Sequence, residues 1–340
     1  MPRPDIAVRS AALLVLVLAA SAAPAADSHP VTAWRLDGGS NRVYLLGSVH
    51  LLREEDHPLP EVIDEIYAEA EVLVMELDYD DVDPAAAQAL IREKGTPEGE
   101  RTLPELMGPQ AWTRARALAA EVHIPLDGLA RVEPWLAAIT VEQLMLARIG
   151  FDPAFGIEHH LAQRAREDGK EVTGLETLDE QLGFLDGMSL EAQRALLLQS
   201  LEESTRIEEL MEGLVCAWRY GDLEHLESRL LASIRDYPEL YEALVTERNR
   251  RWARRIAGLA EDRQDYLVVV GALHLVGEDG LPALLEAAGY ELTRLRNRQT
   301  STISKSSLPA PQSGQRQERG TSSQRVPGGI PDCGSPSASS

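Results

Sequence analysis

The stretch VYLLGSVHLL at residues 43–52 has a close counterpart, LVVVGALHLV, at residues 267–276. Each copy has a short apolar run, then Gly-x-x-His, then two more apolar residues. Short apolar runs of this kind are typical of buried strands. In each copy a Leu-Pro pair then opens a helical pattern, at Leu59 and at Leu281, and another strand pattern follows. The sequence therefore predicts two similar strand–turn–helix–strand units, although one pair is too few to indicate a solenoid.

The segments around these units predict a sheet interrupted by a long helical region. Residues 31–36 and 43–46 read as strands on either side of a Gly/Ser/Asn turn, which indicates a hairpin. Further strands are expected at 72–77, 170–175 and 290–295, and helical patterns at 84–92, 109–121, 134–147, 157–168, 190–215, 223–234 and 238–260. We expect a mixed α/β (α+β) fold, in which a central mixed β-sheet carries two Gly-x-x-His turns at strand ends and is flanked by a large helical insertion.

The two ends of the chain have the composition of a targeting signal and a tail. Residues 1–26 have two arginines, the apolar run 11–20 and a small-residue cleavage pattern, so we interpret them as a signal peptide. The run is short for a bilayer span, which makes an uncleaved anchor the weaker alternative. Residues 299–340 are rich in Ser, Pro, Gly and Gln and are expected to be disordered. The prediction is an exported protein, periplasmic or secreted, with one folded domain at 27–298.

The formal net charge of the 340-residue chain is −22. This acidity argues against nucleic acid, or an anionic membrane surface, as the main partner. No apolar stretch after the signal peptide is long enough for a membrane span, so none is expected after cleavage.

A histidine three residues after a strand-ending glycine can serve a site at the sheet edge. In open α/β sheets ligands bind beyond the carboxyl ends of strands, and glycine there permits a sharp turn and close approach. A lone histidine in this position is more often a loop or packing residue. His50 and His274 share one local frame, so two strands of one sheet would bring them together. We interpret the pair as a candidate divalent-metal site.

Two carboxylates end other predicted strands. Glu76 closes the apolar run 72–77, where an unpaired charge is costly, and is the third candidate ligand. Glu176 follows the strand at 170–175 and is a further ligand, a general base or a carboxylate facing a helix N-terminus.

The helix at 238–260 contains several arginines, most of which suit a solvated face. Arg248 or Asn249 would instead point into the site, to bind a carboxylate or polarise a carbonyl. His159 and His160 are adjacent on a helix, where a surface position is the simpler interpretation.

The ordered set of these residues resembles a known family, the TraB/GumN family, which is similar to the TIKI metalloproteases. The matching residues run through nearly the whole body and are more specific together than either Gly-x-x-His alone. They are Leu46 to Leu51, Leu59-Pro60, Met75 to Asp78, Pro134-Trp135, Gly156 to Glu158, Gly174 to Thr177, Gln181, Trp218, Gly221-Asp222, Arg248-Asn249, Trp252, Gly271 to Gly277 and Gly289-Tyr290.

The resemblance implies a mixed α/β core whose two Gly-x-x-His motifs form a divalent-metal site. For the TIKI branch it implies metal-dependent cleavage of peptides. The residues it favours are His50, Glu76, Glu176, Arg248, Asn249 and His274. The chain departs from the family pattern at Glu158, where the family often has Asp, and the tail after Arg298 has no counterpart.

The leading hypothesis is an exported metallohydrolase, and within that class a peptidase acting on a peptide or protein substrate. His50, Glu76 and His274 would bind manganese, cobalt or zinc, and the metal would activate a water molecule. Arg248 and Asn249 would orient the substrate or stabilise the oxyanion, with Glu176 as ligand or base. The alternatives are a non-catalytic module that holds a metal or haem, and a hydrolase of small esters or lactones.

Overall fold

Six strands form a single sheet in the computed structural model, which describes residues 28–78 and 81–298. The predicted signal peptide and the tail at 299–340 lie outside these residues. The strands are β1 (Ser28–Asp37), β2 (Val43–Ser48), β3 (Val72–Met75), β4 (Glu171–Gly174), β5 (Tyr266–Gly271) and β6 (Glu291–Arg298). Their order is β4-β3-β5-β2-β1-β6, and β1 runs antiparallel to both of its neighbours. The predicted mixed sheet and the β1–β2 hairpin are therefore confirmed.

The two Gly-x-x-His strands, β2 and β5, lie side by side and parallel at the centre of the sheet. Ser48 is in register with Gly271, so the two turns leave the same edge of the sheet one residue apart. From β2 the chain passes through α1 (Glu61–Glu69) to β3, and from β5 through α12 (Leu281–Ala287) to β6. The apolar side chains of α1 and α12 belong to different core clusters, so the two connections cover opposite faces. α/β sheets bind ligands where two neighbouring strands send their connections to opposite faces of the sheet.

Both faces of the central strands are buried, which explains their continuous apolar sequences. Along β2, Tyr44 and Leu46 join the core cluster on one face, whereas Val43 and Leu45 join the cluster on the other. This alternation is the two-residue period of a strand. The central strands therefore provide a rigid base for the turns that follow them.

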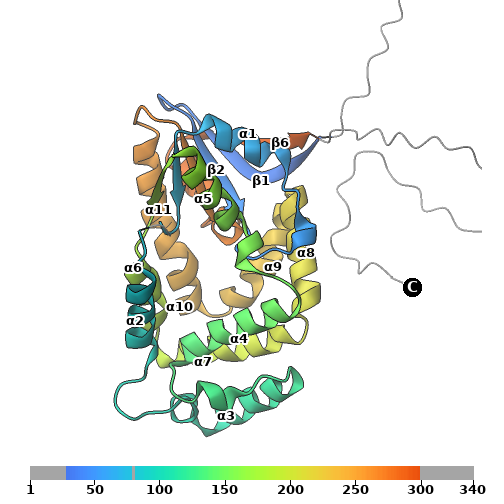
Figure 1. Cartoon of the computed structure of the whole chain (residues 1–340), viewed down its shortest axis with the longest axis vertical. Coiled ribbons are helices and arrows are strands. Elements are labelled where there is room, and N and C mark those ends of the chain that lie inside the picture. Colours follow the sequence, from blue (N-terminus) through green and yellow to red (C-terminus); the bar gives the residue numbers. More distant parts are fainter. Residues whose placement is uncertain (1–27, 79–80, 299–340) are drawn as a thin grey trace, which may run out of the picture.

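The helical region extends away from the sheet, with α3 at the far end of the molecule (Figure 1). Its helices α3, α4 and α7 pack on one another around a separate apolar cluster. The helices between β3 and β5 are α2 (Pro84–Gly95), α3 (Leu103–Glu121), α4 (Pro134–Arg148), α5 (Ile157–Asp168), α6 (Leu178–Asp186), α7 (Leu190–Ser204), α8 (Ile207–Tyr220), α9 (Leu223–Arg235), α10 (Pro238–Tyr241) and α11 (Glu247–Leu259). Over the described ranges, every helix is too short or too polar to cross a membrane.

Three details of the helical predictions were wrong. The single helix expected at 190–215 is α7 and α8, separated where Thr205 donates its hydroxyl to a backbone carbonyl and Arg206 leaves helical backbone angles. The helix expected at 238–260 contains a π-helical segment, η4 (Glu242–Thr246), between α10 and α11. Helix α6 was not predicted, although Thr177 and Glu180 form a capping box before it.

We expect Leu267→Ala in β5 to lower the free energy of unfolding by about 2–5 kcal/mol, because the fully buried side chain would leave a cavity between packed layers. Urea unfolding followed by circular dichroism measures the change. The matched control is Leu144→Ala in α4, whose side chain is exposed and whose loss should change stability by less than about 0.5 kcal/mol. Equal effects of the two substitutions would contradict the core described above.

Candidate functional site

The two predicted histidines both lie near Glu76, at the end of β5. A Cβ atom on Gly271 would lie 3.2 Å from Nε2 of His50 and 3.3 Å from Oε1 of Glu76. The Gly271 N–H donates to the same Glu76 oxygen at 2.7 Å, and Nε2 of His274 lies 3.8 Å from it. A side chain at position 271 would therefore crowd the His50 ring and the Glu76 carboxylate. The expected special backbone angles are absent, because neither Gly47 nor Gly271 has a positive φ.

His274 is held in one tautomer by Asn249. The Asn249 amide nitrogen donates to the carbonyl oxygens of His274 and Asp279, at 3.3 and 2.8 Å, so its Oδ1 faces the imidazole. Oδ1 lies 2.7 Å from Nδ1 of His274, which must therefore carry the proton. Burial, with the positive charge of Arg248, lowers the pKa of His274 to about 3. His274 is thus neutral, and its Nε2 has a lone pair available.

His50 is oriented by Glu158, a residue whose role the sequence left open. Nδ1 of His50 lies 2.7 Å from Oε1 of Glu158, and the Ser48 hydroxyl donates to the same oxygen. The attraction of Glu158 raises the pKa of His50 to about 9. Nδ1 of His50 therefore donates to a carboxylate, and Nε2 faces Glu76. Carboxylate–histidine pairs of this kind orient metal ligands in many proteins.

The first turn of α5 places Glu158 against the turn after β2. The Ile157 N–H donates to the carbonyl oxygen of Val49 at 3.3 Å. A Cβ atom on Gly156 would overlap the carbonyl oxygen of His50, so only glycine allows this approach. The segment Gly156 to Glu158, which is part of the family resemblance, therefore orients His50 in a turn that is distant in the sequence. On the same helix His159 is exposed, as predicted, whereas His160 is half-buried near the ring of His57.

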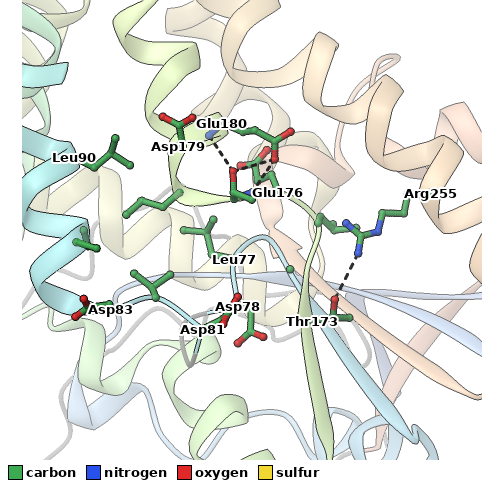
Figure 2. Close-up of a pocket in the computed structure, with 17 residues that line it drawn as sticks. Leu77, Asp78, Asp81, Asp83, Leu90, Thr173, Glu176, Asp179, Glu180 and Arg255 are labelled. Atoms are coloured by element: carbon green, nitrogen blue, oxygen red, sulfur yellow. Dashed lines mark hydrogen bonds between the residues drawn. The ribbon is translucent and has the colours of Figure 1, made fainter. Parts of the chain in front are cut away.

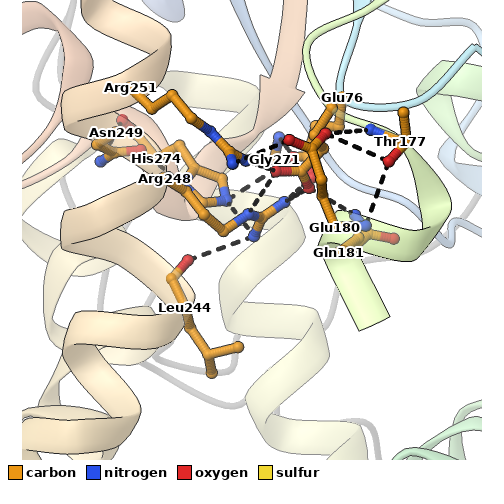
Figure 3. A network of polar contacts seen from close by, with 11 residues as sticks. Glu76, Thr177, Glu180, Gln181, Leu244, Arg248, Asn249, Arg251, Gly271 and His274 are labelled. Atoms are coloured by element: carbon orange, nitrogen blue, oxygen red, sulfur yellow. Dashed lines mark hydrogen bonds and ion pairs between the residues drawn. The ribbon is translucent and has the colours of Figure 1, made fainter. Parts of the chain in front are cut away.

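Arg248 lies at the centre of the buried polar network in Figure 3. Its Nη2 donates to Oε2 of Glu76 at 2.7 Å and to Oε1 of Glu176 at 2.6 Å. Its Nη1 donates to Nε2 of His274 at 3.1 Å. Burial alone would raise the pKa of Glu76, but the basic groups around it and the Gly271 N–H lower it to about 2. Glu76 is therefore a carboxylate that faces both histidines and the guanidinium.

The sequence left open whether Arg248 or Asn249 enters the site, and the structure places both there. Four residues of α11 are buried: Arg248, Asn249, Trp252 and Ile256. Arg248 precedes Trp252 by one helical turn, and its guanidinium lies 4.5 Å from the Trp252 ring centre. That four-residue spacing, with Trp252 and Ile256 as markers of the buried face, was a usable signal in the sequence.

Glu176 binds arginine and does not face the histidines. Its fully buried carboxylate accepts hydrogen bonds from Arg248, from Arg251 at 2.9 Å and from Gln181 at 3.2 Å. Burial raises its pKa despite the charge of Arg248. The contacts thus favour a positioning role for Glu176 over the ligand or base expected from the sequence.

The donors around Gly271 suit a divalent cation, since two imidazole nitrogens and a carboxylate oxygen are a common ligand set. The space that a Cβ atom on Gly271 would fill lies against two of them. Within residues 28–78 and 81–298, however, no three His, Cys, Asp or Glu side chains are already arranged to hold a metal ion. In this structure the guanidinium of Arg248 donates hydrogen bonds to both His274 and Glu76.

A cavity of about 600 Å³ adjoins the network beyond the carboxyl ends of β3 and β4 (Figure 2). Glu176 lines this cavity and also contacts Arg248, so it belongs to both the cavity wall and the buried polar network. Leucines form much of the wall, and carboxylates and one arginine surround them. The residues in question are Leu77, Leu90, Leu175, Leu178, Asp78, Asp81, Asp83, Glu176, Asp179, Glu180 and Arg255.

Comparison with known proteins identifies the family. The model of the TraB/PrgY/gumN family matches residues 32–294, which include every candidate site residue. The chain belongs to the TraB/PrgY/gumN family. The resemblance seen in the sequence is therefore confirmed.

This TraB/PrgY/gumN protein has several curated relatives. It is 24% identical over 247 residues to the uncharacterized protein YbaP of Escherichia coli (strain K12), covering 73% of this chain and 89% of the relative. An uncharacterized protein of Treponema pallidum (strain Nichols) is 26% identical over 182 residues, 53% of this chain and 54% of its own. Metalloprotease TIKI2 of Danio rerio is 29% identical over 159 residues, 39% of this chain and 31% of the relative. No solved structure gives a significant match.

We expect Glu158→Gln to lower the pKa of His50 from about 9 toward its ordinary value of 6.5, because the attracting charge is removed. A raised pKa in the folded protein stabilises it below the unfolded value, and this contribution disappears as pH rises through the folded pKa. The wild-type protein, kept metal-free with a chelator, should therefore lose stability between about pH 6.5 and about pH 9. The variant should lack that loss.

The measurements are an NMR titration of the His50 ring and urea unfolding across this pH range. Glu202→Gln, which removes an exposed carboxylate paired with Arg114, is the control and should leave the His50 titration unchanged. An unchanged titration in Glu158→Gln would mean that Glu158 does not govern His50.

Proposed function

We propose that this protein is a divalent-metal-dependent hydrolase, and within that class a peptidase. The observation that supports the proposal is the arrangement around Oε1 of Glu76. This oxygen and Nε2 of His50 both lie beside Gly271, and Nε2 of His274 lies 3.8 Å from the same oxygen. Each imidazole also has its other nitrogen held by a side chain, which is typical of metal ligands. The partial similarity to a metalloprotease supports the same class of reaction.

In this proposal His50, Glu76 and His274 hold the cation, which would be manganese, cobalt or zinc. When bound, such an ion activates water and polarises the substrate carbonyl. Asn249 keeps Nε2 of His274 unprotonated, and Glu158 does the same work of orientation for His50. Arg248 supplies N–H donors for the negative charge that develops on the carbonyl oxygen. Glu176 positions Arg248 by binding two of its nitrogens.

We propose that the substrate is a peptide or protein segment, part of which enters the cavity in Figure 2. The cavity lies at the same edge of the sheet as the histidines, and its wall combines leucines with carboxylates. Pockets that mix an apolar surface with a few polar groups are suited to amino-acid side chains. The predicted signal peptide supports a site of action outside the cytoplasm, in the periplasm or after secretion.

The first test is elemental analysis of the purified protein beside the His50→Ala/His274→Ala variant. We expect about one equivalent of transition metal in the wild-type protein and none in the variant, because both imidazoles are ligands. Hydrolysis of a peptide library, with the same metal added, should be lost together with the metal. The control is His225→Ala, which removes an imidazole that pairs with Asp222 on α9.

Each other outcome selects a different function. Metal that remains bound in the double variant would reject the proposed ligands. Stoichiometric metal without turnover on any peptide would favour a binding module. Turnover of small esters or lactones without peptide cleavage would retain the metallohydrolase and reject the peptidase.

We expect Leu90→Trp to raise KM for peptide substrates on the order of tenfold, because the larger ring would occupy the cavity, while kcat and metal content stay unchanged. Steady-state kinetics on a peptide found in the library screen measures this. Leu144→Trp makes the same substitution at an exposed position of α4 and should leave KM unchanged. A fall in kcat alone, with KM constant, would mean that the cavity does not receive substrate.

A further inference from the structure

We propose that Arg248 occupies the place of the metal in the metal-free site, and that metal loading displaces its guanidinium from His274 and Glu76. The inference rests on the proposed metal site and adds a competition between the metal and a side chain of this chain. It does not depend on which substrate is hydrolysed. Its consequence is that Arg248 weakens metal binding at the site it also serves.

The decisive contact is between Arg248 and His274. Nδ1 of His274 carries the proton, because it faces the side-chain amide oxygen Oδ1 of Asn249 at 2.7 Å. Nε2 therefore has one lone pair, and Nη1 of Arg248 donates to it at 3.1 Å. One lone pair cannot accept a hydrogen bond and bind a metal at the same time. His274 becomes a ligand only when this hydrogen bond is broken.

Glu76 takes part in the same competition. Its Oε2 accepts a hydrogen bond from Nη2 of Arg248 at 2.7 Å, and its Oε1 accepts one from the Gly271 N–H. The side chains of Glu76 and Arg248 are 7% and 8% exposed, so their charges are little screened by water. In the metal-free protein the guanidinium donates a hydrogen bond to the Glu76 carboxylate and compensates part of its buried charge. A divalent cation beside Glu76 would take over that compensation and would repel the guanidinium.

Glu176 and the π-helical segment provide alternative partners for Arg248. Nε and Nη2 of Arg248 contact the two oxygens of Glu176, at 3.3 and 2.6 Å, which is the two-point geometry that arginine favours with a carboxylate. Nη1 also lies 3.3 Å from the carbonyl oxygen of Leu244, within η4. Arg248 can therefore leave His274 and Glu76 while most of its hydrogen bonds persist. Its charge stays near the site after the exchange.

The test is the binding of Co²⁺ alone to the purified protein, measured by calorimetry and by the visible absorption of bound cobalt. Arg248→Gln removes the competing cation, so we expect its Kd for Co²⁺ to be at least about tenfold lower than that of the wild-type protein. The metal-free variant should be less stable, because Glu76 and Glu176 lose their shared partner. Co²⁺ should therefore raise the Tm of Arg248→Gln by more than it raises the wild-type Tm, which keeps the comparison valid for a destabilised variant.

Arg251→Gln is the matched control. Arg251 lies on the same helix and also binds Glu176, at 2.9 Å, so the substitution removes a nearby positive charge and a partner of the same carboxylate. The structure shows no hydrogen bond or ion pair from Arg251 to His274 or Glu76 among the described residues. Competition for the lone pair therefore predicts little change in Kd for Arg251→Gln. A second control, Arg248→Gln/His274→Ala, should lose the gain in affinity.

Three outcomes would overturn the inference. Equal gains in Arg248→Gln and Arg251→Gln would show a general effect of charge. Unchanged or weaker binding in Arg248→Gln would show that Arg248 does not compete. Absence of Co²⁺ binding in all variants would remove the metal site itself. Tighter Co²⁺ binding without peptide hydrolysis would leave the competition standing and reject only the peptidase.

Discussion

The parallel pairing of β2 with β5 is the constraint on which the candidate site depends. A register of six residue pairs aligns the two strands and brings both Gly-x-x-His turns to one edge. Because the strands are buried on both faces, a shift of register would move apolar residues out of two cores at once. The approach of His50 and Glu76 to Gly271 is therefore fixed by packing far from the polar groups themselves.

The network around Arg248 shows what a buried cluster of charges contributes. Two carboxylates and a guanidinium are costly to bury, and such clusters often add little to net stability. Their value lies in geometry, because each member fixes the direction of the next. Asn249 determines which nitrogen of His274 carries the proton. Glu158 orients the ring of His50, and Glu176 orients the guanidinium of Arg248.

The sequence predicted the sheet better than it predicted the roles of the polar residues. Buried strands such as β5 are local patterns of apolar residues, and the glycine that ends each one marks a turn. Contacts such as that between His50 and Glu158 join distant segments, and no local pattern specifies them. The function of Glu176 was ambiguous for a similar reason, because its partners Arg248 and Arg251 come from a helix much later in the chain. The break between α7 and α8 was missed because the residues there have ordinary helical propensities.

The two histidines differ sharply in their access to solvent. The side chain of His50 is 51% exposed, whereas that of His274 is 3% exposed and lies behind Arg248 and Trp252. The site therefore has a front and a back. Of the three candidate ligands, only His50 presents a large part of its side chain to water. A reagent in solution therefore has direct access to the ring of His50 and almost none to that of His274.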